Sequence, residues 1–306
     1  MTAGSLIPIE SPRAPAAASG ALADYWALTK PEINFLIAIA TFSGFYLGAS
    51  GRSHFPVLLL MQTLLGTLLV ASGTGTLNQY IERRFDAQMR RTARRPVASG
   101  RLKPSSALWF GIGLSVAGCT YLALVAVNAL ASLFAILTLL SYLLLYTPLK
   151  RRTPLCTLIG AFPGAMPPLI GWAAAKGSLS GEAWVLYSII FFWQFPHFMA
   201  IAWMYRDDYD RAGYLVLPGA PARVRFVFLQ SVLPLLALVS ISLLAAPLAK
   251  LGYLYLAGAS LLNAGFLYYG ARFVLDRSNA NARRLLFASI VYLPLLFVLM
   301  IVVSRF

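Results

Sequence analysis

The sequence is poor in charged residues, and this shortage excludes most soluble folds. Only 11% of the 306 residues are Asp, Glu, Lys or Arg, whereas 59% are hydrophobic. Soluble domains carry about 25% charged residues. A soluble protein of this length could not bury so much apolar surface. The composition therefore indicates that lipid is the solvent for most of the chain.

Cysteine and histidine are also scarce, with two of each. Cys119 and Cys156 both fall inside apolar stretches, which argues against a disulfide framework and a cysteine-based metal site. We interpret both as small buried hydrophobic residues. Residues 1–24 are rich in Ala, Ser and Pro and contain no long apolar core. We expect a flexible cytoplasmic tail there, not a secretory signal, followed by one transmembrane domain over residues 25–306.

The apolar residues are gathered in long runs. A helix needs roughly 20 residues to cross the hydrocarbon core of a bilayer. By this measure the sequence predicts an all-α, polytopic membrane protein with nine transmembrane helices. The predicted spans are Ile33–Leu47, Pro56–Leu77, Ser106–Val125, Ala129–Tyr146, Leu155–Ala175, Ala183–Met204, Phe226–Leu248, Leu251–Phe273 and Leu285–Val303.

Positive charge is unevenly distributed between the loops that join these spans. The net charge of +15 could suggest a nucleic-acid partner, but the Lys and Arg residues lie in short loops, as topology signals do. If the N-terminus is cytoplasmic, the opposite side holds only Arg52, Lys176, Lys250 and Arg305 of the 25 Lys and Arg residues. This bias predicts a cytoplasmic N-terminus, a C-terminus on the other side and no nucleic-acid partner. We expect the chain in the bacterial cytoplasmic membrane.

Half of the ten acidic residues lie in two places at the predicted cytoplasmic boundary. Asn78, Glu82 and Asp86 follow the second span at i, i+4 and i+8, which places three oxygen donors on one face of a helix. Hard oxygen ligands suit Mg²⁺, whose coordination is commonly completed by substrate phosphates. A solvated helix end paired with neighbouring arginines explains this spacing equally well.

The second acidic cluster follows the sixth span, at Asp207, Asp208 and Asp210. Three carboxylates so close together repel one another unless a cation or arginines neutralise them. The alternative is a solvated polar loop. Because both clusters lie at the same predicted membrane face, we expect them to form a cage for divalent ions.

A basic segment lies between the two clusters and includes Arg91 and Arg95. Arginine binds phosphate oxygens in a bidentate manner. Topology signalling and contact with anionic lipid are an equally good explanation of such a segment. An acidic metal site beside a basic cluster is nevertheless the combination that a diphosphate requires.

At these residues the chain resembles the UbiA superfamily of intramembrane prenyltransferases, over roughly Lys30 to the last span. The resemblance implies nine helices around a central cavity. The first motif of the family, Asn-x-x-x-Asp-x-x-x-Asp, is matched by Asn78, Glu82 and Asp86, with Glu82 where most members have Asp. A Tyr-x-x-x-Lys element is matched by Tyr146 and Lys150.

The closer resemblance is to the branch of that superfamily that prenylates heme. The glutamate of the first motif and the Pro-His-Phe sequence of the sixth span are features of this branch. In the second motif, Tyr205 and Tyr209 stand where quinone-type members have a pair of Asp, so Asp207 and Asp208 become the expected ligands. The matching segments are Tyr80–Asp86, Arg91–Thr92, Arg95–Pro96, Tyr146–Arg151, Trp193–Phe198, Tyr205–Tyr209 and Ala212–Gly213.

This resemblance implies that a farnesyl group passes from farnesyl diphosphate to a vinyl group of heme B, giving heme O and diphosphate. A downstream heme-modifying enzyme would receive the product, and the bilayer would hold both lipophilic substrates. Mg²⁺ is the expected metal. Its expected ligands are Asn78, Glu82, Asp86, Asp207 and Asp208, with Tyr146 and Lys150 as further catalytic residues and Lys30, Arg91, Arg95, His197, Tyr205 and Tyr209 as further substrate-binding residues.

His197 lies inside the sixth predicted span, nearly three helical turns before the second acidic cluster. Ionisable residues within a membrane are functional candidates, and histidine is a usual ligand of heme iron. A hydrogen bond between helices is the competing explanation.

Two other functions compete with heme prenylation. One is prenylation of another aromatic acceptor, against which Glu82 and the Pro196–His197 pair argue. The other is transport of an anionic lipid or a metal. Transport would favour charges near the bilayer midplane and broken helices in paired halves, whereas these acids lie at one face.

Overall fold

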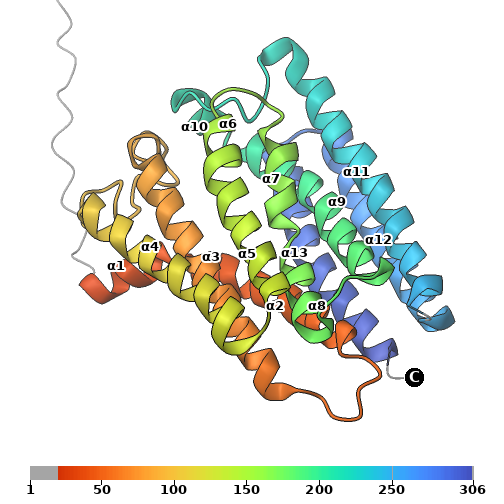
Figure 1. The fold of residues 1–306 in the computed structure, drawn as a ribbon. Coiled ribbons are helices and arrows are strands. Elements are labelled where there is room, and N and C mark those ends of the chain that lie inside the picture. The colour runs from red at the N-terminus through yellow and green to blue at the C-terminus, as the bar shows by residue number, and fades with distance from the viewer. Residues whose placement is uncertain (1–19, 250, 305–306) are drawn as a thin grey trace, which may run out of the picture.

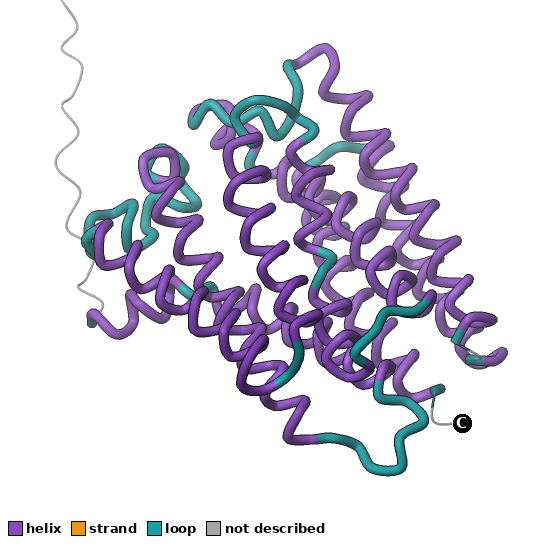
Figure 2. The backbone as a smooth tube through the Cα atoms, viewed as in Figure 1, coloured by secondary structure: helices purple, strands orange, loops and turns teal. Residues whose placement is uncertain are grey.

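The computed structural model describes residues 20–249 and 251–304, and these ranges form a helical bundle without strands (Figures 1 and 2). Residues 1–19 of the predicted tail lie outside the described residues, and the first helix begins within the remainder, at Ala21. The helices are α1 (Ala21–Leu28), α2 (Pro31–Gly48), α3 (Val57–Asp86), α4 (Pro104–Thr120), α5 (Ala129–Leu140), α6 (Thr147–Leu149), α7 (Cys156–Gly164), α8 (Pro167–Lys176), α9 (Gly181–Met204), α10 (Arg206–Arg211), α11 (Ala220–Leu248), α12 (Gly252–Leu275) and α13 (Asn279–Val303), with π-helical segments η1 (Tyr121–Ala126) and η2 (Ser141–Tyr146).

Helices occupy all nine predicted spans, and within the described ranges seven of them are long and apolar enough to cross a membrane. The other two are α2 and α12. Polar residues lower the mean hydropathy of these two helices, for example Glu32 and Asn34 in α2 and Asn263 in α12. The prediction of an all-helical membrane protein is confirmed, and the exact count of nine spans stays a prediction. The seven segments are Val57–Asp86, Pro104–Leu124, Ala129–Leu149, Cys156–Lys176, Gly181–Met204, Pro221–Leu248 and Asn279–Val303.

The fifth predicted span is broken into α7 and α8. Pro163 lies in the last turn of α7, and Pro167 is the first residue of α8. Proline has no N–H to donate and its ring clashes with the carbonyl four residues earlier, so the backbone leaves the helical path between them. Gly164 lies at the break and directly against the Gln194 side chain of α9, where a larger residue would collide.

Close helix packing depends on glycine where α2 crosses α8. Gly44 of α2 lies against the backbone of Pro168, and Gly171 of α8 lies against the backbone of Thr41, so that a Cβ at either position would overlap main-chain atoms. Small residues allow helices to approach in this way when lipid surrounds them. The second half of the broken span is thereby held against the N-terminal part of the bundle.

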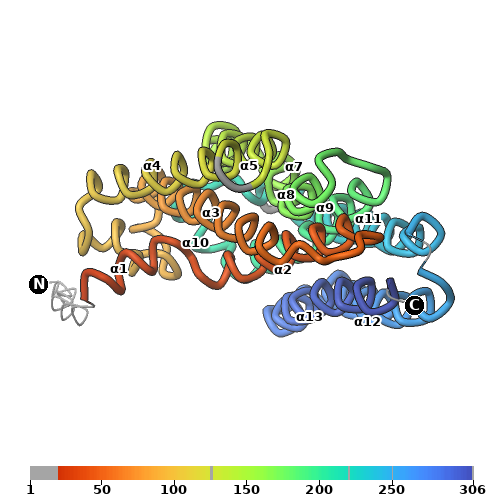
Figure 3. The backbone as a smooth tube through the Cα atoms, turned by 60° about the horizontal axis from the view of Figure 1, so that its bottom comes forward, coloured from red at the N-terminus to blue at the C-terminus, as the bar shows by residue number. Residues whose placement is uncertain are grey.

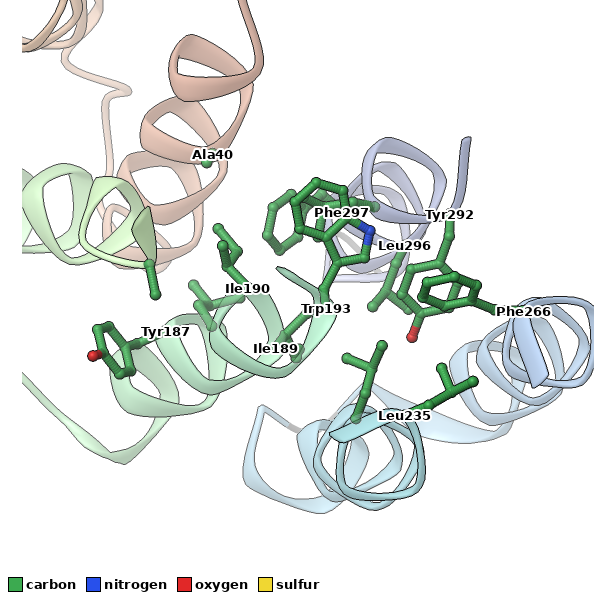
Figure 4. Close-up of a cluster of buried hydrophobic side chains, with 14 of the residues drawn as sticks. Ala40, Tyr187, Ile189, Ile190, Trp193, Leu235, Phe266, Tyr292, Leu296 and Phe297 are labelled. Carbon is green, nitrogen blue, oxygen red and sulfur yellow. The ribbon is translucent and has the colours of Figure 1, made fainter. Parts of the chain in front are cut away.

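The largest hydrophobic cluster joins α9 with α11, α12 and α13. In Figure 4 the indole of Trp193 in α9 lies beside Phe297 and Leu296 of α13, and Phe266 of α12 lies against Tyr292. The Tyr292 hydroxyl donates a 2.7 Å hydrogen bond to the Asn263 side chain, which satisfies a buried polar group between α12 and α13.

The two ends of the bundle have different chemistry. Helices α6 and α10 lie at one end, and the C-terminus of the described chain and α8 lie at the other (Figure 1). Helices α1 and α12 lie on opposite sides of the molecule (Figure 3). The first acidic cluster lies in the last turns of α3, the second lies in α10, and the basic segment follows α3 in the turns before α4.

Candidate active site

The last three turns of α3 present the predicted oxygen donors on one buried face. Asn78, Glu82 and Asp86 are 1%, 5% and 1% exposed, respectively. All three belong to the continuous helix Val57–Asp86, so their four-residue spacing brings them onto one side. Their burial excludes the alternative of a solvated helix end.

Each of these three side chains has a cationic partner from a different segment. The Lys30 Nζ donates to the Asn78 Oδ1 at 2.9 Å, and the Lys150 Nζ lies 2.9 Å from the Glu82 Oε1. Arg95 donates from Nη1 to both oxygens of Asp86, at 2.9 and 2.8 Å. Taking charges out of water is costly unless they are paired and hydrogen-bonded, so these pairs explain how the acids tolerate burial. Three cations therefore converge on one helix face.

Lys30 adopts a strained backbone conformation. Its φ of 54° is in the left-handed region, and it is the only non-glycine residue with positive φ in the described ranges. Such a conformation costs of the order of 1–3 kcal/mol and persists where the surrounding structure demands it. Pro31 begins α2 directly afterwards. The strained turn aims the Lys30 ammonium at Asn78.

The charge of Lys30 is sensitive to pH near neutrality. Burial, together with the positive charge of Arg95, lowers the pKa of Lys30 to about 7. An anion placed beside this ammonium would favour its protonated form. Lys30 is thus positioned to take up a proton when an anionic ligand enters.

Lys150 lies in an aromatic and acidic enclosure. Burial alone would lower the pKa of Lys150, but the adjacent Glu82 carboxylate raises it well above its ordinary value. Its Nζ lies 4.5 Å from the centre of the Tyr146 ring and 6.0 Å from that of Tyr214. The Lys150 ammonium is consequently a fixed positive charge beside the first acidic motif.

The π-helical segment η2 leads directly into this enclosure. Thr147 follows it and donates from Oγ1 to the Tyr142 carbonyl, five residues earlier, at 2.9 Å. Pro148 has no N–H for the ladder and would clash with the carbonyl four residues before it, which favours the wider turn. Thr147 also accepts a 3.2 Å hydrogen bond from the Asn78 amide. The wider turn thus joins the Tyr146 element to α3.

The second acidic cluster is divided by the structure. Asp208 is buried, accepts from the Arg91 backbone N–H at 3.3 Å and pairs with Arg211 at 3.0 Å. The Asp207 side chain is 81% exposed, and Asp210 pairs with Arg223. Asp208 is therefore the member of the cluster that contacts the basic segment.

Arg91 connects the basic segment to the two tyrosines of the second motif. Its guanidinium lies 5.1 Å from the centre of the Tyr205 ring and donates to the Tyr209 hydroxyl at 3.2 Å. These contacts are consistent with cation–π attraction. The two tyrosines thus contact an arginine where the quinone-type pattern has two acids.

A cavity of about 370 Å³ opens beside Glu82. Of the residues that line this cavity, only Glu82 was predicted from the sequence to be a site residue. Tyr214 is 3% exposed and comes from the loop after α10, where the Leu215 N–H donates to the Lys150 carbonyl at 2.6 Å. Burial, and then the negative charge of Glu82, raise the pKa of Tyr214. The lining residues are Ile81, Glu82, Phe85, Thr147, Pro148, Arg151, Arg152 and Tyr214.

Among the described residues, His197 contacts Ser289 of α13 and none of the residues of the acidic clusters. Its Nδ1 lies 2.8 Å from the Ser289 Oγ, and its ring stacks on Trp193 with centroids 4.7 Å apart. Ser289 has a single hydroxyl hydrogen, which it donates to the Leu286 carbonyl at 2.6 Å. The Nδ1 of His197 must then be the donor to Ser289, which leaves its Nε2 with a lone pair. The predicted helix-to-helix hydrogen bond is present, and heme contact stays a prediction.

The donor chemistry of the α3 face fits Mg²⁺. Asn78, Glu82 and Asp86 supply one amide and two carboxylate groups, which are the hard oxygen ligands that Mg²⁺ prefers. Among the described residues, however, no three His, Cys, Asp or Glu side chains form a ready-made metal cage. The face can therefore supply part of a coordination sphere, with substrate phosphates supplying more.

Comparison with known proteins places the chain in a family. The model of the UbiA prenyltransferase family matches residues 37–292. A protoheme IX farnesyltransferase from Solibacter usitatus is 48% identical over 285 residues, which cover 91% of this chain and 97% of the relative. Another from Gloeobacter violaceus is 42% identical over 293 residues, or 94% of each chain.

Solved structures show the same fold at low sequence identity. A digeranylgeranylglyceryl phosphate synthase superposes with a TM-score of 0.73 at 18% identity, over 92% of this chain and 98% of that one. A UbiA homologue from Archaeoglobus fulgidus bound to GPP and Mg²⁺ gives a TM-score of 0.57 at 13% identity, over 92% and 100% of the two chains. The chain belongs to the UbiA prenyltransferase family and is an integral membrane prenyltransferase.

We expect the affinity for a diphosphate to fall as the pH rises through about 7, because Lys30 loses its proton there. The sign follows from its lowered pKa: Lys30 is charged below that pH and neutral above it. Calorimetric titration with inorganic diphosphate from pH 6 to 9 measures the slope. In Lys30→Arg the charge persists, so the remaining slope is that of the ligand. Equal slopes in the two proteins would remove Lys30 from the diphosphate site.

Proposed function

We propose that this chain transfers the farnesyl group of farnesyl diphosphate to a vinyl group of heme B, giving heme O and diphosphate. The observation that carries the proposal is the convergence of Lys30, Lys150 and Arg95 on the buried acidic face of α3. The relatives that are 48% and 42% identical, whose names specify protoheme IX farnesyl transfer, support the choice of substrates. We assign the site to the cytoplasmic face of a bacterial inner membrane.

Fixed positive charge would drive ionisation of the allylic C–O bond. As the bond breaks, its electron pair goes to the leaving diphosphate, and Lys150, Arg95 and Lys30 bind the oxygens that gain charge. Mg²⁺, when bound, would neutralise more of that charge. The oxygen donors that would hold it are Asn78, Glu82, Asp86, Asp207 and Asp208, of which Asp208 lies nearest the basic segment through Arg91.

The remaining chemistry requires positioning and not a protein nucleophile. The π electrons of the vinyl group attack C1 of the farnesyl cation, and water then adds to the new cation and releases a proton. Tyr146 and Tyr214 lie against Lys150, where their rings restrict access of water to the ionising bond. Arg91, together with Tyr205 and Tyr209, would bind a diphosphate oxygen from the other side.

The product test is direct. Purified protein is incubated with heme B, farnesyl diphosphate and Mg²⁺, and the extracted heme is analysed by mass spectrometry. We expect the mass to increase by one farnesyl group and one hydroxyl. Unmodified heme together with prenylation of an aromatic quinone precursor would reassign the acceptor. Uptake of an anionic lipid into proteoliposomes without any product would instead indicate a transporter.

We further propose that a heme-modifying enzyme receives the product.

We predict that the N-terminus is cytoplasmic and the C-terminus lies on the opposite side. The basis is the placement of all but four of the 25 Lys and Arg residues on one side. Reporter fusions after Ser304 and in the loop near Arg94 should give opposite signals. Identical signals would mean that the chain crosses the membrane an even number of times between these points.

His197→Ala should weaken heme binding about tenfold and leave the affinity for farnesyl diphosphate almost unchanged. The reason is the free Nε2 lone pair inside the membrane bundle, which can bind heme iron but cannot act on a leaving diphosphate. Heme titration followed by absorption spectroscopy measures the first affinity.

Ser289→Ala is the matched control for His197, because it removes the same hydrogen bond between α9 and α13 and retains the imidazole. We expect Ser289→Ala to lower thermal stability and to keep the heme spectrum. If both variants lose the same stability and neither changes heme affinity, His197 is structural.

A further inference from the structure

A second cavity lies at the end of the bundle opposite the acidic clusters. It has a volume of about 220 Å³, and its walls come from the ends of α2, α8, α11 and α13 and the start of α9. In Figure 1 this end contains α8 and the C-terminus of the described chain. The lining residues are Leu47, Ser50, Trp172, Lys176, Glu182, Val185, Leu186, Ala245, Leu248, Ala249, Leu251, Met300 and Ser304.

Among the described residues that line the cavity, one is a cation and one is an anion, and the two form no direct ion pair. Lys176 lies over the Trp172 ring, with Nζ 5.0 Å from its centre, and Glu182 accepts a hydrogen bond from the Ser180 hydroxyl. No ion pair joins Lys176 to Glu182 among the described side chains. The two side chains attract each other without a direct contact, so each can still form a direct ion pair with an opposite charge on a ligand.

Trp172 provides an independent indication of a ligand. It lines the cavity and is only 3% exposed, yet its Nε1–H has no hydrogen-bond partner in the described structure. A buried donor without a partner costs about 1–3 kcal/mol. An acceptor oxygen from a bound molecule would satisfy it. Lys176, beside the same ring, would favour a negatively charged acceptor.

Size and position identify the kind of molecule. Cavities that enclose a whole drug-sized ligand measure about 300–1,000 Å³, so this one admits only part of a larger molecule. It lies at the ends of membrane-spanning helices, where the hydrocarbon layer meets water. Apolar residues such as Leu248 and Met300 line it together with the charged ones. A bilayer phospholipid with its head in the cavity and its chains outside meets these conditions.

We propose that this cavity binds the headgroup of a zwitterionic aminophospholipid, with the phosphate at Lys176 and Trp172 and the ammonium at Glu182. The opposite charges on the protein complement the two charges of such a headgroup. An anionic headgroup without an ammonium, such as that of phosphatidylglycerol, could place its phosphate at Lys176 but would gain no ion pair at Glu182. The site is separate from the prenyl-transfer site and does not depend on the proposed function.

Native mass spectrometry of the full-length protein, purified in detergent and delipidated, tests the proposal. We expect phosphatidylethanolamine to bind about tenfold more tightly than phosphatidylglycerol. Glu182→Gln should abolish this preference, whereas Trp172→Phe, which keeps an aromatic ring and removes only the N–H, should weaken both lipids. Glu32→Gln is the matched control, since Glu32 is an exposed carboxylate at the start of α2, and it should bind as the wild type does.

Two results would overturn the proposal. One is equal affinity of the wild type for the two lipids, and the other is an unchanged preference in Glu182→Gln. Tighter binding of phosphatidylglycerol would reassign the cavity to anionic lipids. The thermal midpoint of each variant without added lipid, and its affinity for farnesyl diphosphate, show whether the fold is retained.

Discussion

Asp86→Asn is expected to lower kcat/KM by on the order of 10²-fold, which corresponds to about 2.7 kcal/mol of transition-state stabilisation. The substitution keeps the shape of a side chain that is 1% exposed and removes its charge. It leaves Arg95 without a charged partner and takes one carboxylate from the proposed metal site. Steady-state rates of heme O formation measure the loss, and excess chelator should abolish turnover in the wild type until Mg²⁺ is restored.

Asp210→Asn is the control for Asp86→Asn. Asp210 belongs to the second acidic cluster, but its half-exposed carboxylate pairs with Arg223. An exposed ion pair contributes at most about 1 kcal/mol, so we expect rates within severalfold of the wild type. Wild-type rates in Asp86→Asn would remove Asp86 from the site, and full activity in excess chelator would remove the metal from the mechanism.

Lys150→Met should abolish turnover and destabilise the protein by about 3–5 kcal/mol, because it leaves the buried Glu82 carboxylate without a partner. The side chains of this pair are only 14% and 6% exposed, so solvent cannot replace the lost ammonium. The thermal midpoint in detergent measures the loss of stability, and heme O formation measures the loss of activity.

The double variant Glu82→Gln/Lys150→Met separates the two effects of Lys150. Removing both charges together should recover most of the stability, since neither partner is then left charged and buried. Activity should stay absent, because the positive charge beside the leaving group is still missing. Recovery of both stability and activity would show that Lys150 serves only to neutralise Glu82.

The arrangement of the α3 face could be predicted from the sequence, because it depends only on the helical repeat. The partners of that face could not. Lys30 and Lys150 lie 48 and 68 residues away along the chain from the groups that they bind, and no spacing rule connects them. Arg95 was expected to bind phosphate, and the structure adds its hydrogen bonds to both carboxylate oxygens of Asp86. Tyr214 was missed because it lies in a loop, where no helical repeat indicates which residues come together, and the structure joins this loop to Lys150 by a backbone hydrogen bond from Leu215.

The helices themselves were predicted with characteristic errors at their ends. Helices α11 and α13 each begin six residues before the predicted span, because their first turns carry polar and basic residues that extend beyond the apolar run. The break between α7 and α8 was missed because hydrophobicity is continuous across it. The signal was present in Pro163 and Pro167, whose effect on the backbone is independent of hydropathy.

The internal pairing of the α3 acids has a consequence for biogenesis. Small metal-binding domains whose ligands have no other partner fold only when the metal arrives. Here Glu82 and Asp86 have Lys150 and Arg95 as built-in counter-ions, so the chain can be inserted and assembled without regard to the supply of divalent cations. The same cations are then already in place when a diphosphate arrives. We therefore expect the protein to reach its folded state before it meets either the metal or a substrate.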